Sequence, residues 1–69
     1  MKYDYDKIID NLRLLRLKNR LKQSEVAEVL NITDSMYCIL ENKKCSLDTK
    51  QLLDLLNYYK VNLEDLMND

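Results

Sequence analysis

Apolar residues recur at helical spacing through most of the chain, in five segments separated by short polar stretches. In the first segment, Ile8, Ile9, Leu12 and Leu15 form one apolar face, as expected for a helix packed against a core. A later segment has a broader apolar face, made of Leu52, Leu53, Leu55, Leu56 and Tyr59. The spacing predicts five helices, at approximately residues 5–19, 24–30, 34–41, 49–59 and 62–67.

Polar residues at the ends of these segments support the boundaries. Thr33 and Asn62 suit the caps of the helices that follow them, and Asp48 with Gln51 resembles a capping box. Asn31 suits a left-handed turn after the second helix, because Asn tolerates a positive φ. The second and third helices are then joined by about three residues and must cross steeply, which is a helix-turn-helix geometry. The second helix of such a unit can lie in the major groove of DNA.

The length of 69 residues predicts one small domain, 1–69, and the 46% apolar and 33% charged residues indicate a globular chain. We expect an all-α, compact five-helix bundle with the helix-turn-helix at its centre. A chain this short buries only about 60% of its unfolded surface, so it depends on well-packed helices or on pairing with a copy of itself.

The residue types argue against several classes of protein. The chain has no Gly, Pro or His, so a glycine-rich phosphate loop, a His-based triad and a His-ligated metal site are excluded. We expect no enzyme activity, no metal and no cofactor. Cys38 and Cys45 are not spaced as a metal-binding or redox pair, although a redox role for either stays open. The sequence shows no signal peptide or membrane span, and we expect a cytoplasmic protein with reduced cysteines.

Net charge is −1, whereas proteins that bind nucleic acid are usually basic. The charges are unevenly distributed along the chain, and two basic runs contain Arg13, Arg16, Lys18, Arg20 and Lys22, then Lys43, Lys44 and Lys50. Acidic residues concentrate towards the two ends. We expect a small positive face on a nearly neutral body, the alternative being that these runs are solvated helix faces.

Four pieces of the sequence, in this order and spacing, resemble one family. They are NLRLLR (11–16), LKQSEVAEVLNIT (21–33), LEN (40–42) and YYKVNLEDL (58–66). The chain resembles the phage-repressor or Cro-type (xenobiotic-response-element type) helix-turn-helix domain. The resemblance implies a lambda-repressor-like DNA-binding domain that binds double-stranded DNA as a homodimer.

The resemblance also assigns roles to residues. It implies that Arg16 and Glu41 form a structural ion pair and that Ala27 and Tyr37 lie inside. The candidate contacts to DNA phosphates are Lys22, Gln23, Ser24, Asn42, Lys43 and Lys44. The candidate contacts to base edges are Thr33, Asp34, Ser35, Cys38 and Ile39. None of these five is Arg, Lys, Gln or Asn, so either specificity rests on few direct contacts together with DNA shape, or this helix recognises something other than DNA bases.

Three positions where the family often has Gly carry other residues, namely Arg20, Asn31 and Lys43. If φ is positive there, Arg20 and Lys43 each cost about 1 kcal/mol. Lys22 replaces the usual Ser or Thr cap of the second helix, which weakens the start of that helix.

We therefore expect a sequence-specific transcriptional regulator, a small dimeric repressor regulated by its own level or by a partner protein. The dimer surface is expected at the fifth helix or at Leu14 and Leu17, which fall outside the apolar stripe of the first helix. These two leucines could instead pack on the N-terminal arm, residues 1–5. The alternative function is a protein-interaction module, such as an antitoxin or adaptor, on the same scaffold.

Overall fold

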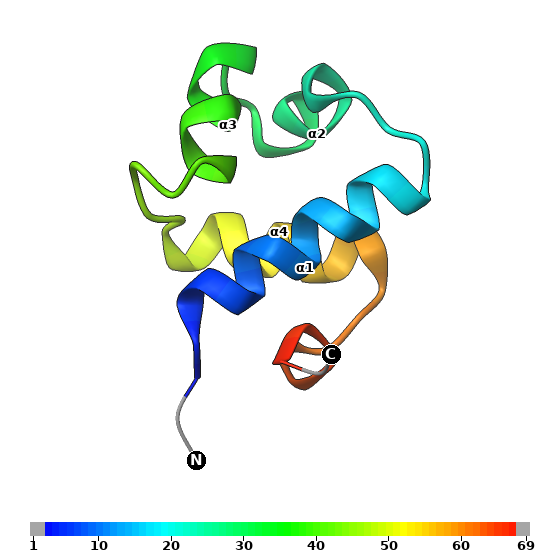
Figure 1. Ribbon diagram of the computed structural model, residues 1–69. Coiled ribbons are helices and arrows are strands. Elements are labelled where there is room, and N and C mark those ends of the chain that lie inside the picture. The colour runs from blue at the N-terminus through cyan, green and yellow to red at the C-terminus, as the bar shows by residue number, and fades with distance from the viewer. Residues whose placement is uncertain (1–2, 68–69) are drawn as a thin grey trace.

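The computed structural model describes residues 3–67, which form four α-helices and a final 3-10 helix. The elements are α1 (Tyr5–Lys18), α2 (Gln23–Leu30), α3 (Asp34–Glu41), α4 (Thr49–Tyr59) and η1 (Leu63–Met67) (Figure 1). The all-α class is confirmed, but the prediction of a fifth α-helix was wrong. The last segment is only five residues long and closes with an i→i+3 bond, from the Asp65 N–H to the Asn62 carbonyl at 3.0 Å.

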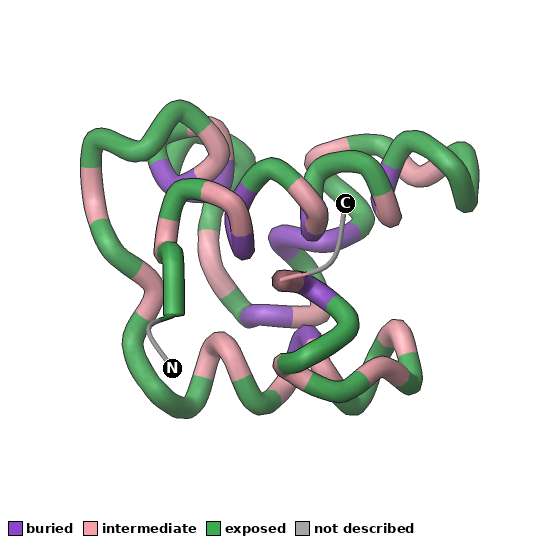
Figure 2. Tube along the Cα trace, turned by 60° about the horizontal axis from the view of Figure 1, so that its bottom comes forward, coloured by how far each residue is buried: buried purple, intermediate pink, exposed green. Residues whose placement is uncertain are grey.

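The other elements lie on three sides of α1. In Figure 1, α2 and α3 lie on one side of α1, η1 lies on the opposite side, and α4 runs behind it. Buried residues from every element meet in one core, and Figure 2 shows them as short stretches interrupted by exposed positions. This alternation is the helical period seen in the sequence.

The core is centred on aliphatic side chains. Val26 and Ala27 of α2 are fully buried, as are Leu55 of α4 and Leu66 of η1. The broad apolar face predicted for α4 was too wide, because Leu53 is 53% exposed. A helix of this length can turn only one stripe towards the core, and that stripe is occupied by the side of α4 that carries Leu55.

Side chains cap most of the helix starts. Thr33 Oγ1 accepts from the Met36 N–H at 3.1 Å. Asp48 and Gln51 form the complete capping box, with N···O distances of 2.7 and 2.9 Å. Asn62 does not cap η1 with its side chain; its backbone N–H instead donates to Asp65 Oδ2 at 2.9 Å.

All four α-helices end in the same way, without glycine. Arg20, Asn31, Lys43 and Lys60 have φ values of 58°, 57°, 63° and 58°. After each of them, the next backbone N–H donates to a carbonyl five residues back, for example Ile32 to Ala27 at 3.0 Å. This is the Schellman pattern. The left-handed conformation predicted for Asn31 is confirmed. The φ of Arg20 and Lys43, on which the expected strain depended, is also positive, and Lys60 is a further strained position that was not predicted.

Candidate functional site

The candidate site lies on α2 and α3, two successive helices that pack against each other. The three residues 31–33 join the helices, and the buried side chains of Val26, Ala27, Tyr37 and Leu40 hold them against the core. Ala27 is fully buried, as the resemblance implied for a residue that lets two helices approach. The opposite side of α3 is left open to solvent.

The candidate base-contacting residues lie on or beside this open side of α3. Thr33, Asp34, Ser35 and Ile39 are exposed, and Ser35 and Ile39 are one helical turn apart. Cys38 is only partly accessible, and its Sγ lies 3.3 Å from Asn42 Nδ2. The structure therefore brings four of the five candidates together and places Cys38 at the edge of the group.

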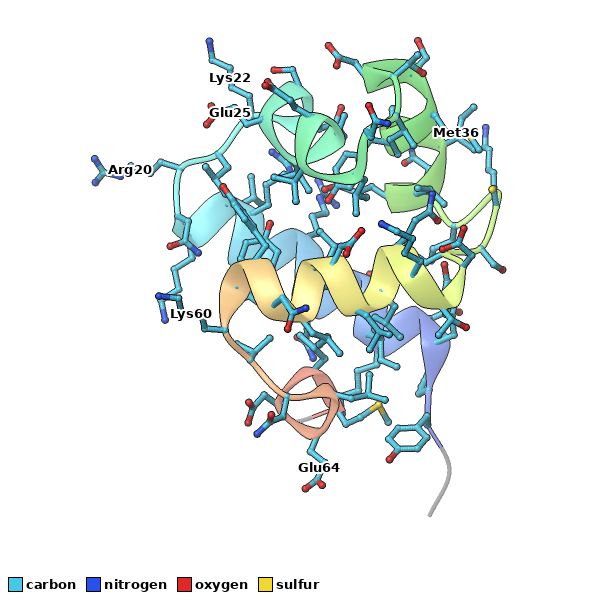
Figure 3. All side chains as sticks on the ribbon, turned by 180° about the vertical axis from the view of Figure 1, so that it is seen from behind. Arg20, Lys22, Glu25, Met36, Lys60 and Glu64 are labelled. Atoms are coloured by element: carbon cyan, nitrogen blue, oxygen red, sulfur yellow. The ribbon has the colours of Figure 1, made fainter. Side chains whose placement is uncertain are left out.

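The candidate phosphate contacts divide into two groups. Lys22, Ser24 and Lys44 are exposed near the start of α2 and after the end of α3. Figure 3 shows Lys22 projecting away from the protein. The other three candidates have side chains already engaged within the protein, namely Gln23, Asn42 and Lys43.

These three engaged side chains have well-defined partners. Gln23 Nε2 donates to Glu41 Oε1 at 3.0 Å, and Asn42 Nδ2 donates to the Cys38 carbonyl at 2.9 Å. Lys43 Nζ lies 2.9 Å from Asp10 Oδ1, a hydrogen bond that raises the pKa of Lys43. The Gln23–Glu41 and Lys43–Asp10 contacts join residues that only the folded chain brings together, and the Asn42 bond forms because the end of α3 leaves the Cys38 carbonyl accessible, so none of the three was predicted.

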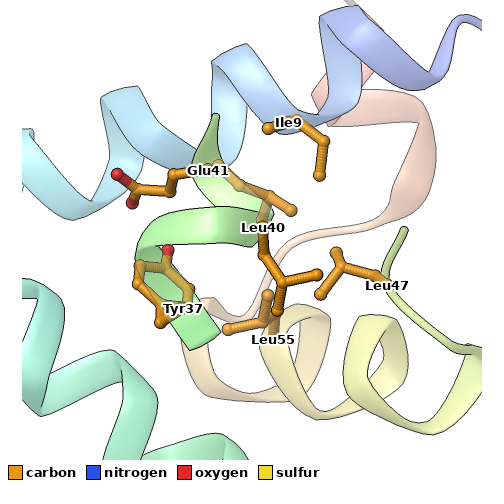
Figure 4. A pocket seen from close by; sticks show the side chains of 7 residues that line it. Ile9, Tyr37, Leu40, Glu41, Leu47 and Leu55 are labelled. Carbon is orange, nitrogen blue, oxygen red and sulfur yellow. The ribbon is translucent and has the colours of Figure 1, made fainter. Parts of the chain in front are cut away.

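Glu41 is the centre of a buried polar network beneath the α2–α3 surface. Its carboxylate receives Arg16 Nε at 2.7 Å and Arg16 Nη2 at 3.2 Å, and Arg16 Nη1 donates to the Leu21 carbonyl at 2.9 Å. The Tyr37 hydroxyl also bonds to Glu41, and Figure 4 shows both side chains at the edge of an apolar pocket. Burial acts to raise the pKa of Glu41, but hydrogen bonds from Arg16, Gln23 and Tyr37 lower it below its ordinary value.

The expected positive face is smaller than the basic runs suggested. Arg16 is buried in its ion pair, and Lys43 and Lys50 are paired with Asp10 and Asp54. Three acidic residues, Glu25, Glu28 and Asp34, are exposed on α2 and α3. Of the candidate phosphate contacts, Lys22 before α2 and Lys44 after α3 therefore remain as exposed lysines without an ion pair among residues 3–67, against three exposed carboxylates on the same two helices.

Met36 is a surface residue that the sequence analysis did not select. It is 38% exposed, and Ile39, three residues later on the same side of α3, is 40% exposed. The signal was present in the helical spacing, because Tyr37 and Leu40 already fill the inward stripe of this short helix. Met36 and Ile39 give the open side of α3 an apolar patch.

Other kinds of site find little support in the described part of the chain. Residues 3–67 contain no cluster of three or more Cys, Asp or Glu side chains that could hold a metal ion. Within the same residues, no helix has the length and apolar character needed to cross a membrane.

No family model matches the chain, and no curated protein or solved structure matches it either. Function therefore has to be inferred from the residues of the α2–α3 surface themselves.

Proposed function

We propose that this protein is a helix-turn-helix transcriptional regulator that binds double-stranded DNA as a dimer, with α3 in the major groove. One observation carries the proposal. Two eight-residue helices, α2 and α3, are joined by three residues and anchored on one side by Ala27 and Tyr37, and the other side of α3 is open. A helix supported in this way can enter a groove that accepts one α-helix.

The residues on the open side have the chemistry to contact base edges. Ser35 can donate or accept a hydrogen bond, Ile39 can contact a thymine methyl group, and Asp34 can accept from the amino group of cytosine. Lys22 precedes α2 and Lys44 follows α3; both are exposed, and a cation at either place can meet a phosphate of the DNA backbone. A dimer that covers two such half-sites in a promoter acts as a repressor by occupancy, without an effector domain.

The test is to select bound DNA from a pool of random duplexes at about 0.1 M salt, where surface electrostatics are partly screened. An enriched pseudo-palindrome with half-sites about one helical turn apart supports the proposal. If no sequence is enriched while circular dichroism shows that the protein is folded, the proposal is overturned.

Two sets of variants separate phosphate contacts from base contacts. Lys22→Ala with Lys44→Ala should weaken binding to every sequence and lower the salt slope by about 1 for each lysine. Lys60→Asn is the matched control, because Lys60 is exposed on a distant part of the surface (Figure 3) and Asn tolerates its positive φ.

Ser35→Ala or Ile39→Ala should change the preference among DNA sites. An equal loss of affinity for all sequences would contradict the assignment of Ser35 and Ile39 to base contacts.

A second function is favoured by a different observation. The exposed apolar pair Met36 and Ile39 shares α3 with the exposed carboxylate of Asp34, a surface that suits a protein partner with an apolar and basic face. A complex formed through such apolar contacts would persist in high salt, whereas DNA binding falls steeply. Loss of partner binding in Ile39→Asp, with no DNA selected from the pool, would establish this function instead.

A further inference from the structure

The outer face of α1 carries two leucines that the rest of the fold leaves uncovered. Leu14 is 60% exposed and Leu17 is 50% exposed, which confirms the expectation from their spacing. In Figure 1, α1 runs across the front of the protein with α4 behind it. The described part of the N-terminal arm does not cover them, because Asp4 contacts Met67 and Tyr5 contacts Leu47. Residues 1–2 lie outside the described part of the chain.

The shape of this face fits another helix. One shallow depression is bounded by Asp10, Arg13, Leu14 and Leu17, at spacings i, i+3, i+4 and i+7 along α1. A second depression continues beside it towards η1, and four of its lining residues have the same spacing, namely Asn11, Leu14, Leu15 and Lys18. Four residues in this arrangement form the hole that receives a side chain from a facing helix.

The charges along α1 identify what kind of helix fits. The first half carries three carboxylates against one lysine, at Asp4, Asp6, Asp10 and Lys7. The second half and the following turn are positive at the surface, through Arg13, Lys18 and Arg20. A helix with one acidic and one basic half is complementary to an antiparallel copy of itself. The same patch on two copies can then form an isologous interface with two-fold symmetry.

We propose that two copies of this chain pair through antiparallel α1 helices, with the two-fold axis beside Leu14. Leu14 of each copy enters the depression between Asp10, Arg13, Leu14 and Leu17 of the other copy. In this register Asp10 faces Lys18 of the second copy. Asp10 keeps 60% of its side chain exposed while bonded to Lys43, so its carboxylate remains open to a second cation.

The pairing has a consequence for the α2–α3 surface. In Figure 1, α2 and α3 lie on one side of α1 and η1 on the other. A two-fold axis that runs from the η1 side to the α3 side makes the two α1 helices antiparallel and keeps both α3 helices on the same side of the dimer. Two α3 helices on one side are what a palindromic DNA site requires.

The experiment is sedimentation equilibrium of the full chain without DNA, from about 1 µM to about 500 µM, a range that detects weak to moderate dimers. The wild-type protein should dimerise, and Leu14→Glu should weaken the dimer by about 100-fold or more, because both copies lose a buried leucine and gain a charge. Leu53→Glu is the matched control, since Leu53 is equally exposed on α4 and should leave the dimer intact.

A charge exchange tests the register, with the fold of each variant checked by circular dichroism because Asp10 also pairs with Lys43 of its own copy. Lys18→Asp places a carboxylate opposite Asp10 of the second copy and should weaken the dimer. Asp10→Lys with Lys18→Asp restores opposite charges and should recover most of the affinity. Any one of three results would overturn the proposal. The wild-type protein could be monomeric, the dimer could survive Leu14→Glu, or the charge exchange could fail to recover the affinity of the dimer.

This inference rests on the dimeric part of the proposed function, but its outcome can be separated from DNA binding. A dimer that is sensitive to Leu14→Glu and selects no DNA supports the α1 interface and removes the DNA proposal. A protein that selects a palindrome and pairs through another face removes the α1 interface and keeps the DNA proposal.

Discussion

Arg16 and Glu41 connect α1 to the last turn of α3 through a two-point ion pair, at 2.7 and 3.2 Å, although they are 25 residues apart in the sequence. Both side chains are almost fully removed from solvent. The pair fixes where α3 ends relative to α1, and Gln23 extends the network to the start of α2 by its bond to Glu41. The orientation of the α2–α3 surface therefore depends on a buried polar contact as well as on the apolar core.

Replacing Glu41 with Ala should lower the free energy of unfolding by about 3 kcal/mol, because the buried Arg16 guanidinium loses its charged partner. The measurement is urea unfolding followed by circular dichroism. The double variant Arg16→Met with Glu41→Leu should be less destabilised than Glu41→Ala, since no buried charge is left unpaired. Equal stability of Glu41→Ala and the wild type would show that the pair does not stabilise the fold.

The same network predicts how stability depends on acid. The hydrogen bonds to Glu41 outweigh burial and hold its pKa below the ordinary value in the folded protein. The unfolded state binds the proton more readily, so the stabilisation is complete above a pH of about 4.5 and is lost as the pH falls through the folded-state pKa. Glu41→Gln should make unfolding less dependent on pH in this acid range. If the free energy of unfolding of Glu41→Gln fell with acid as steeply as that of the wild type, the role assigned to Glu41 would be contradicted.

Tyr59 predicts a substitution that does not destabilise the protein. Its hydroxyl is buried and has no hydrogen-bond partner among the described residues. Tyr59→Phe removes this unsatisfied group while keeping the ring, which lies edge-on to Tyr58 with centroids 5.2 Å apart. We expect the free energy of unfolding to stay the same or rise by up to about 1 kcal/mol at neutral pH.

Tyr59 also predicts the response to base. Burial raises the pKa of Tyr59 to about 12, so the unfolded state ionises first as the pH rises above about 10. The stabilisation due to the neutral form is present below that pH and is lost as the pH approaches the folded-state value. Thermal unfolding of Tyr59→Phe should therefore depend less on pH between about 10 and 12 than the wild type does. Parallel pH profiles for the two proteins would refute this assignment.

The residues with positive φ at the helix ends indicate where a substitution by glycine should stabilise the folded protein. Arg20→Gly and Lys60→Gly should each raise the free energy of unfolding by about 0.5 to 1 kcal/mol, because glycine adopts positive φ without steric cost. Asn31→Gly is the control and should gain less, since Asn already tolerates this conformation. Chemical denaturation of the three variants gives the comparison. A larger gain at Asn31 than at Lys60 would rule out relief of strain as the cause.

The helical class and most of the helix boundaries could be predicted from local patterns in the sequence. Apolar spacing and polar caps are local, and a residue such as Thr33 or Asp48 acts on a backbone N–H only three positions away. For the same reason, the exposure of Leu14 and Leu17 and the left-handed conformation of Asn31 followed from residue type and position in the chain. The sequence also identified most of the residues that now line the open side of α3, because helical spacing separates an inward stripe from an outward one.

Which of these residues remain available for binding depends on contacts that form in the folded protein. Gln23 and Lys43 look equally free in the sequence, yet the fold pairs them with Glu41 and Asp10, so the charge of the surface differs from the charge of the segments. Likewise, Leu53 is exposed because the core accepts one side of α4, and five residues at the chain end form a 3-10 turn instead of an α-helix. These outcomes depend on distances between residues remote in sequence, which a local pattern of apolar and polar positions does not specify.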